Sequence, residues 1–306
     1  MISRLDGVTC MEPNRLFKYV SIETLMHILS GSVRLTQPSA FNDPFELLPE
    51  ICVPLDQVER KLSISFDITA TRRSPPVGEV NGNSEGYNCC DITSRNILKE
   101  LNRSIGILCL SKISDSLLMW SHYADQYAGA VIEFDSNNEF FNGQIDIEYR
   151  SHRPKKNISA YLSEGAPVPL AELCVKPEQW QYEHEVRIIR SLETCEDTGK
   201  VLRGFPIYTQ KIPLSAIKEI TLGERTTVEN QRTVWETIRK TDISLSLAAV
   251  ANWGYEFRKE MVKSGLNPNI SPRTAHVFSH LPDGLGDIAR LLLAQHPLST
   301  FVNTTT

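Results

Sequence analysis

Apolar residues recur along the chain at two different spacings, and the segments that carry them alternate. Residues 16–20 and 33–36 predict short strands, and between them the apolar positions of residues 22–29 have the spacing of an amphipathic helix. Ser21 stands where a helix N-cap is expected, and Gly31 stands just after the last turn. The chain is therefore predicted to open with a strand, a helix and a second strand.

The same alternation continues further along the chain. Residues 105–110 are almost wholly apolar, which predicts a strand buried on both faces. Residues 117–127 follow an N-cap at Ser116 and predict a helix, and residues 130–135 predict another strand. The remaining predicted elements are helices at about 92–101, 226–240 and 285–295 and strands at 217–222 and 243–247.

The stretch from Trp180 to Ile189 predicts a strand with an unusually polar face. Because side chains alternate along a strand, Val186 and Ile188 share an apolar face. The opposite face carries Glu183, Glu185, Arg187 and Ile189. Two interpretations stay open. The carboxylates and the guanidinium either form cross-strand pairs on a half-exposed edge or line a functional site.

A second polar cluster lies in residues 37–46, where two prolines indicate a shaped loop. Asn42 and Asp43 can bond to nearby backbone and hold this loop as a simple turn. The alternative is a rigid polar loop beside a ligand, flanked by Phe41 and Phe45.

A third cluster lies on the helix predicted at residues 117–127. His122 falls outside the apolar stripe, as a surface histidine does. Its neighbours Trp120 and Tyr123 can stack or hydrogen-bond, so the cluster is also a candidate for ligand binding.

Composition places the chain among globular proteins and sets limits on its partners. The chain has 306 residues, of which 41% are hydrophobic and 23% charged, and the net charge is −5. This balance argues against the basic footprint of a duplex-DNA binder. The one basic cluster, residues 150–156, is either a solvated loop or a contact for phosphate or nucleic acid.

Cysteine usage and hydropathy indicate a cytoplasmic protein. The seven cysteines include no C-x-x-C pair, which argues against structural zinc and favours reduced thiols. Residues 1–14 lack the apolar core of a signal peptide, and no apolar run approaches the roughly 18 residues of a membrane span. We expect one domain at residues 1–260 with an exposed, mobile insertion loop at 71–90, and a C-terminal extension at 261–306 with one helix.

Four motifs resemble a widespread prokaryotic domain family of unknown function. They are Leu-Phe-Lys-Tyr at 16–19, Phe-Asn-Asp-Pro-Phe-Glu at 41–46, Leu-Met-Trp-Ser-His-Tyr-Ala at 118–124 and Trp-x-Tyr-Glu-x-Glu-x-Arg at 180–187. The resemblance covers about residues 16–260. That family has been suspected of a distant relation to the ADP-ribosyltransferases. The resemblance thus implies an α+β fold with a split mixed β-sheet core, flanking helices and an ADP-ribosyltransferase-like plan.

It also implies a site for NAD as the ADP-ribose donor, with no resident metal. Glu185 takes the place of the catalytic glutamate that stabilises the oxocarbenium-like transition state, and Glu183 orients or deprotonates the acceptor. Arg187 pairs with a carboxylate or with a pyrophosphate oxygen. The expected cofactor-binding residues are Lys18, Tyr19, Asn42, Asp43, Trp120, His122, Tyr123 and Arg187. Lys18 departs from the His or Arg usual on the first strand of such enzymes.

Some toxins of phage-defence toxin–antitoxin systems carry such domains, and one class modifies messenger RNA. The resemblance therefore implies a toxin that modifies RNA or protein, with an antitoxin and a chaperone as partners. Two alternatives stay open. One is a non-catalytic binding or regulatory module in which Glu185 and Arg187 form a structural ion pair. The other is a metal-dependent nuclease using Asp43, Glu133, Asp135 and Glu185, although these residues lack the close spacing of known metal motifs.

Overall fold

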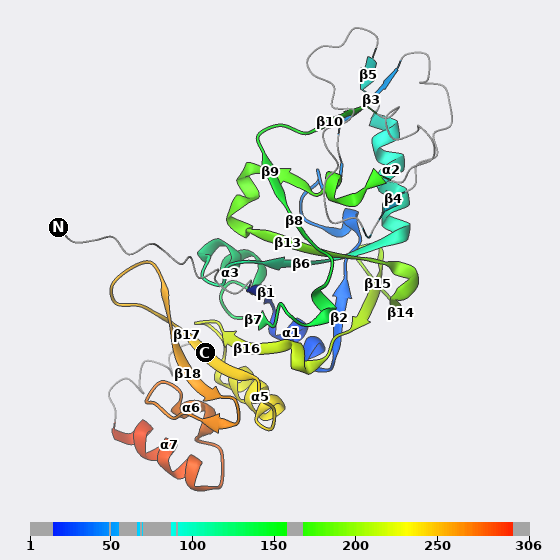
Figure 1. Cartoon of the computed structure of the whole chain (residues 1–306). Helices are drawn as coiled ribbons and strands as arrows, with labels where there is room; N and C mark the ends of the chain where they lie inside the picture. The colour runs from blue at the N-terminus through cyan, green and yellow to red at the C-terminus, as the bar shows by residue number, and fades with distance from the viewer. Residues whose placement is uncertain are drawn as a thin grey trace, which may run out of the picture.

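The centre of the fold is a nine-stranded mixed sheet (Figure 1), seen in a computed structural model that describes residues 15–48, 50–54, 66–67, 69, 87–89, 91–157 and 168–295. From one edge to the other the strands are β19 (Asn267–Pro268), β18 (Phe257–Ser264), β17 (Ser244–Val250), β16 (Ile217–Leu222), β7 (Ala130–Phe134), β1 (Leu16–Val20), β6 (Ile105–Ser111), β13 (Glu185–Ser191) and β8 (Gln144–Asp146). Neighbouring strands are antiparallel except for β16 and β17, which are parallel. An α+β fold with a mixed sheet, as predicted, is confirmed.

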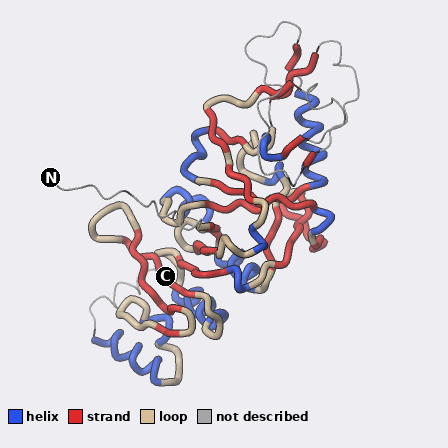
Figure 2. The backbone as a smooth tube through the Cα atoms, viewed as in Figure 1, coloured by secondary structure: helices blue, strands red, loops and turns tan. Residues whose placement is uncertain are grey.

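Helices cover the sheet and extend to the two ends of the molecule. They are α1 (Ile22–Leu29), α2 (Asp91–Ser104), α3 (Leu117–Tyr123), α5 (Val228–Ile238), α6 (Ala275–Phe278) and α7 (Gly284–Gln295). Strands run through the middle of the molecule, while α2 and α7 lie at opposite ends (Figure 2). The first helix begins as predicted, because the Ser21 hydroxyl accepts the backbone N–H of Thr24.

A smaller antiparallel sheet, β14 (Glu196–Leu202), β15 (Phe205–Lys211) and β2 (Ser32–Leu35), meets the large one near the centre of the molecule. The backbones of Thr36, just after β2, and Ile107 in β6 hydrogen-bond to each other and join the two sheets. This junction brings the polar side of β2 close to β1 and β6.

Short strands complete the fold around residues 50–177. They are β3 (Glu50–Pro54), β4 (Phe66–Asp67), β5 (Tyr87–Cys89), β9 (Glu148–Arg150), β10 (Lys155–Asn157), β11 (Val168–Pro169) and β12 (Val175–Pro177). Most of the predicted insertion loop, residues 71–86 and 90, lies outside the described residues. The loop prediction is wrong for Tyr87–Cys89, which pair with β3.

The strand predicted from Trp180 is wrong in its first half. Residues Glu178–Glu183 form a 3₁₀ helix, His184 has a left-handed backbone with φ of 43°, and the strand starts only at Glu185. The alternation of apolar and polar residues predicts a strand here, but such a pattern cannot reveal a tight turn. The strand is also buried on both faces and is not a half-exposed edge, because β13 lies between β6 and β8.

The C-terminal region packs on the main sheet as far as it is described. The boundary predicted at residue 260 falls inside β18, and buried residues of α6 and α7, such as Phe278 and Ala289, belong to the same hydrophobic cluster as β1 and β7. The helix predicted at 285–295 is confirmed as α7. Within the described ranges, every helix is too short or too polar to cross a membrane.

Candidate functional site

A cavity of about 270 Å³ opens where β1, β2 and β6 meet the loop after β2, the helix α3 and the start of β13. Six of the ten predicted site residues line it, namely Lys18, Tyr19, Asn42, Tyr123, Glu183 and Glu185. The lining also includes Arg34, Thr36, Phe41, Cys109, Ser111 and Lys176. All four sequence motifs therefore contribute a residue to one cavity, although they are far apart in the chain.

A tight turn brings Glu183 and Glu185 to the same wall. Glu185 is the first residue of β13 and lies opposite Ser111 of β6 in the sheet register. The Ser111 hydroxyl donates to the backbone carbonyl of Glu183 at 2.6 Å, and His184 between the two glutamates has a left-handed backbone. The predicted strand face was expected to put both carboxylates on one surface. The turn has the same result, since both side chains line the cavity.

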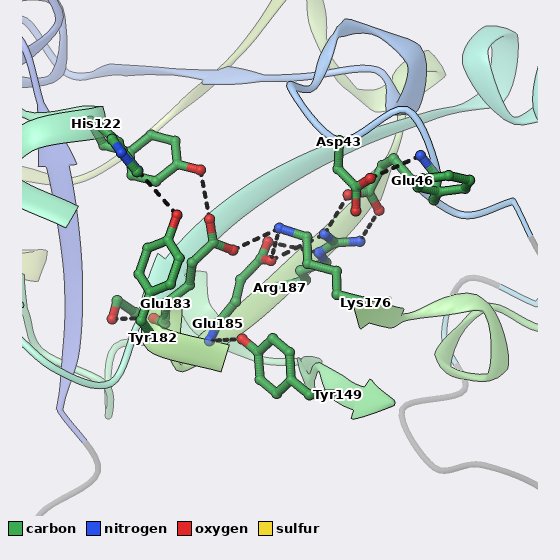
Figure 3. Close-up of polar contacts among 12 residues, drawn as sticks. Asp43, Glu46, His122, Tyr149, Lys176, Tyr182, Glu183, Glu185 and Arg187 are labelled. Carbon is green, nitrogen blue, oxygen red and sulfur yellow. Dashed lines mark hydrogen bonds and ion pairs between the residues drawn. The ribbon is translucent and has the colours of Figure 1, made fainter. Parts of the chain in front are cut away.

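Lys176, at the centre of β12, holds the two carboxylates together. Its Nζ lies 2.7 Å from Glu183 Oε2 and 2.6 Å from Glu185 Oε2 (Figure 3). Burial alone would lower the pKa of Lys176, but the negative charge of Glu185 and its neighbours outweighs burial and raises it. Lys176 is therefore a permanent cation between two acids.

The two acids respond to their surroundings in opposite ways. Burial favours the neutral form of Glu185, but Arg187 and Lys176 overcome this effect and lower its pKa to about 2. Burial dominates at Glu183 and raises its pKa, with Lys176 opposing and the charge of Glu185 adding to the rise. The wall thus holds one carboxylate that is always ionised and one that binds a proton more readily than an ordinary glutamate.

Arg187 lies behind Glu185 and does not line the cavity. Its Nε donates to Glu185 Oε1 at 2.8 Å, and its terminal nitrogens donate to both oxygens of Glu46. Its guanidinium lies over the Phe41 ring, 5.8 Å from the centroid, and the side chain is fully buried. Of the two partners predicted for Arg187, the structure shows the carboxylate.

Tyr123 connects the carboxylate wall to α3. Its hydroxyl donates to Glu183 Oε1 at 2.6 Å. His122 points away from the cavity lining, and its Nδ1 lies 3.1 Å from the Tyr182 hydroxyl. His122 and Tyr182 therefore form an outer pair beside the turn that carries Glu183 (Figure 3).

Of the aromatic residues Tyr19 and Trp120, the first lines the cavity and the second packs against the first. Tyr19 lines it and donates its hydroxyl to the carbonyl of Ile113 at 3.1 Å. Trp120 is buried behind Tyr19 in an edge-to-face contact, with ring centroids 5.7 Å apart, and packs on Phe257 at 6.1 Å. Trp120 is thus part of the core and supports Tyr19 rather than facing the cavity.

Asn42 and Asp43 have different places in the loop after β2. Asn42 lines the cavity, whereas Asp43 is buried and accepts the Phe45 N–H at 2.9 Å through Oδ1. This bond is the turn-forming contact expected of an aspartate before proline. The loop also carries Glu46, so it delivers Asn42 to the cavity and Glu46 to Arg187.

The cavity lining also includes two cations away from Lys176. Lys18 of β1 donates to the carbonyl of Cys109 at 3.0 Å, its one hydrogen bond within the described residues. Arg34 of β2 lines the same cavity, and among the residues that the structure describes its buried Nε has no hydrogen-bond partner. Burial lowers the pKa of both groups, and the nearby Arg203 lowers that of Arg34 further.

Sequence reasoning missed Glu46, Lys176 and Arg34. Arg34 and Thr36 fall on one face of the predicted strand at 33–36, opposite Val33 and Leu35, so alternation alone could have identified this part of the lining. No local pattern marks Lys176, because only tertiary structure brings β12 beside β13.

The residues considered for a metal site do not converge. Of that set only Glu185 lines the cavity, while Glu133 pairs with Arg15 and Asp135 pairs with Lys218. Within the described ranges, no three or more His, Cys, Asp or Glu side chains are arranged as in a metal site.

Residues 119–188 match a protein family described as "Protein of unknown function (DUF2971)". The matched stretch holds the whole carboxylate wall and Tyr123, while Lys18 and Arg34 precede it. The match agrees with the predicted resemblance to a domain family of unknown function, and the relation to ADP-ribosyltransferases stays a prediction. Comparison with curated proteins and with solved structures gave no match.

Proposed function

We propose that the cavity is the active site of an NAD-dependent ADP-ribosyltransferase that modifies RNA or a protein. The observation that carries the proposal is the carboxylate pair, since Glu183 and Glu185 line one cavity and their pKa values move in opposite directions. Pairs of acids with separated pKa values are typical of sites where one acid stays charged and the other moves a proton.

The proposed reaction uses each acid once. The bond between ribose C1′ and the nicotinamide nitrogen breaks, and its electron pair leaves with neutral nicotinamide. Positive charge develops on the ribose, and the ionised Glu185 stabilises it. A hydroxyl or amine of the acceptor forms the new bond to C1′, and its proton passes to Glu183.

The other residues of the cavity fit this assignment. Tyr19, Phe41 and Tyr123 supply ring surface for the nicotinamide, and Asn42 supplies an amide that can donate to a ribose hydroxyl or to the carboxamide. Lys176 keeps the two acids at one place, because its ammonium contacts both. Trp120 acts through Tyr19 and is a supporting residue in this scheme.

A second candidate is a non-catalytic binding module, and the burial of Arg187 favours it. Arg187 is fully buried and Glu185 contacts two cations, as expected of an ion cluster that stabilises the fold. In that case Glu185→Gln destabilises the protein but removes no chemistry.

The test is incubation of the protein with labelled NAD and extracts of RNA and protein. Four chains are compared: wild type, Glu185→Gln, Glu183→Gln and the control Glu100→Gln, which changes an exposed glutamate on α2. We expect wild type and Glu100→Gln to transfer label. Each cavity variant should lose roughly 100-fold or more of the rate, the cost typical of removing a charge-stabilising group or a general base.

Several outcomes separate the candidates. Equal background label in all four chains, with no NAD-induced thermal shift in the wild type, would exclude the transferase. RNA cleavage without NAD that EDTA abolishes would instead support a nuclease. Growth inhibition on expression that Glu185→Gln relieves would support a toxin, whereas normal growth with verified folded protein would argue against one.

A further inference from the structure

Lys18 and Arg34, two further cations of the cavity lining, have hydrogen-bonding capacity left over. An ammonium has three N–H donors, and Lys18 uses one within the described residues, on the carbonyl of Cys109. A guanidinium has five donors, and no side-chain hydrogen bond of Arg34 occurs among the residues described, with Nε itself buried. Both side chains line the cavity, so the free donors are available to a ligand.

Such a pair of cations is costly unless an anion binds to it. Burial of a cation without a counter-charge is unfavourable, and here Lys18 and the half-buried Arg34 share one small cavity. The charge of Glu185 favours the Lys18 ammonium, but neither acid forms an ion pair with Lys18 or Arg34 in the described part of the chain. Glu183 contacts Lys176 and Tyr123, and Glu185 contacts Lys176 and Arg187. An anionic group with several acceptor oxygens would satisfy the donors of Lys18 and Arg34 together, as phosphate does.

Cavity size limits how much of a nucleotide can enter. Cavities that bury drug-sized ligands are about 300–1,000 Å³, so about 270 Å³ is small for a dinucleotide. One nucleotide unit is roughly half of NAD and is a better match to this volume. The lining offers both carboxylates and cations, which suits a unit that carries a sugar and a phosphate.

We propose that Lys18 and Arg34 form a phosphate subsite, so that the cavity holds the nicotinamide mononucleotide half of NAD and leaves the adenosine half outside. This inference rests on the proposed function for the identity of the base, but the phosphate contact stands on the geometry of Lys18 and Arg34. Arg34 thereby takes the phosphate contact that sequence reasoning considered for Arg187, whose guanidinium is held by Glu46 and Glu185.

The test measures binding and does not require turnover. Nicotinamide mononucleotide and nicotinamide riboside differ by one phosphate, so the ratio of their dissociation constants reports the phosphate contact. We expect the mononucleotide to bind wild type roughly 10- to 100-fold more tightly, the range of a charge-assisted hydrogen bond. Arg34→Gln should bring this ratio close to one, and Lys18→Met should reduce it.

Arg203→Gln is the matched control, because Arg203 lies close enough to Arg34 to lower its pKa but does not line the cavity. It should keep most of the wild-type ratio, and a thermal melt of each variant should show that it is folded. Equal binding of the two ligands by the wild type, or a ratio that Arg34→Gln leaves unchanged, would overturn the subsite. Inorganic phosphate that stabilises the protein as much as the mononucleotide does would overturn the assignment to a nucleotide.

The result separates this inference from the proposed function. A phosphate-dependent ratio without any transfer of label from NAD would keep the subsite and refute the transferase. Transfer of label with equal binding of mononucleotide and riboside would keep the transferase and refute the subsite. Because the adenosine half lies outside the cavity, NAD and NADP should also be used at similar rates, and strict rejection of NADP would count against the proposal.

Discussion

Two sets of cations surround Glu185, and their surroundings differ sharply. Arg187 is fully buried with its guanidinium matched to Glu46 and Glu185 and placed over the Phe41 ring. Lys18 and Arg34 face a cavity. Within the described residues, Lys18 donates one hydrogen bond, to the Cys109 carbonyl, and the Arg34 guanidinium donates none. In the first arrangement the donors are matched within the protein, and in the second, as far as the described residues show, donors are left without a partner.

This difference teaches how to separate structural charge from functional charge in one network. A cation whose donors are all matched inside the protein contributes to folding, and removing it leaves its acids unpaired. A cation with unmatched donors in a cavity costs stability and is retained for what it binds. Mutations in the two sets should therefore differ in sign, and the following predictions test that contrast.

The largest effect is expected from Arg187→Met. The change keeps the volume of the side chain but leaves Glu46 and Glu185 buried without their main counter-charge. Breaking a buried pair in this way costs about 3–5 kcal/mol of the free energy of unfolding, which urea denaturation can measure. The control Arg239→Met removes an exposed pair with Glu236 and should cost under about 1 kcal/mol. Equal losses in the two variants would show that the Arg187 cluster is no more important than a surface pair.

Glu185→Gln should change how stability depends on pH. The folded pKa of Glu185 is about 2 and its ordinary value 4.5, so its charge stabilises the fold above pH 4.5 and this contribution is lost as pH falls toward 2. The shift corresponds to about 3 kcal/mol. Glutamine should remove that part of the acid-induced loss, while Glu100→Gln should keep it. An identical acid profile for wild type and Glu185→Gln would mean that Glu185 is not held ionised by Arg187 and Lys176.

Lys18→Met should show the opposite sign to Arg187→Met. The variant removes a buried ammonium that has one hydrogen bond, to the Cys109 carbonyl, and replaces it with an apolar side chain of similar length. We expect the ligand-free protein to gain up to about 1 kcal/mol, because the desolvation cost of the cation disappears. A loss comparable to that of Arg187→Met would show that Lys18 is structural and would remove the contrast between the two sets of cations.

Sequence patterns predicted the segments that form this site better than the contacts between their side chains. The four motifs converge on one cavity, and the pairing of Arg187 with a carboxylate was among the expected contacts. These predictions succeeded because local residue types decide where a strand, a cap or a shaped loop forms. The two acids line one cavity, but not through the strand face that was predicted, since a 3₁₀ turn and a left-handed His184 separate Glu183 from the strand.

The partners that set the chemistry of the site were out of reach of sequence reasoning. Lys176 is 7 residues from Glu183, which it contacts. Glu46 is 141 residues from its partner Arg187. Their roles depend on the packing of β12 and of the loop after β2 against β13. Contacts that depend on packing leave no periodic signal in the sequence. An arginine in Glu-x-Arg spacing therefore looks the same whether it binds a ligand or fills the core.

The smallest effect concerns Tyr123, whose hydroxyl donates to Glu183 at 2.6 Å. Removing this donor in Tyr123→Phe destabilises the ionised form of Glu183, so the pKa of Glu183, already raised by burial, should rise further. If Glu183 accepts the proton from the acceptor, the acidic limb of the pH–rate profile should move to higher pH by about one unit, the equivalent of one hydrogen bond. The control Tyr182→Phe removes the partner of His122 and should leave the limb in place. If the acidic limb of the pH–rate profile does not move in a Tyr123→Phe variant of unchanged stability, a group other than Glu183 accepts the proton. Glu185 would then be the one acid of the pair with a role in the reaction.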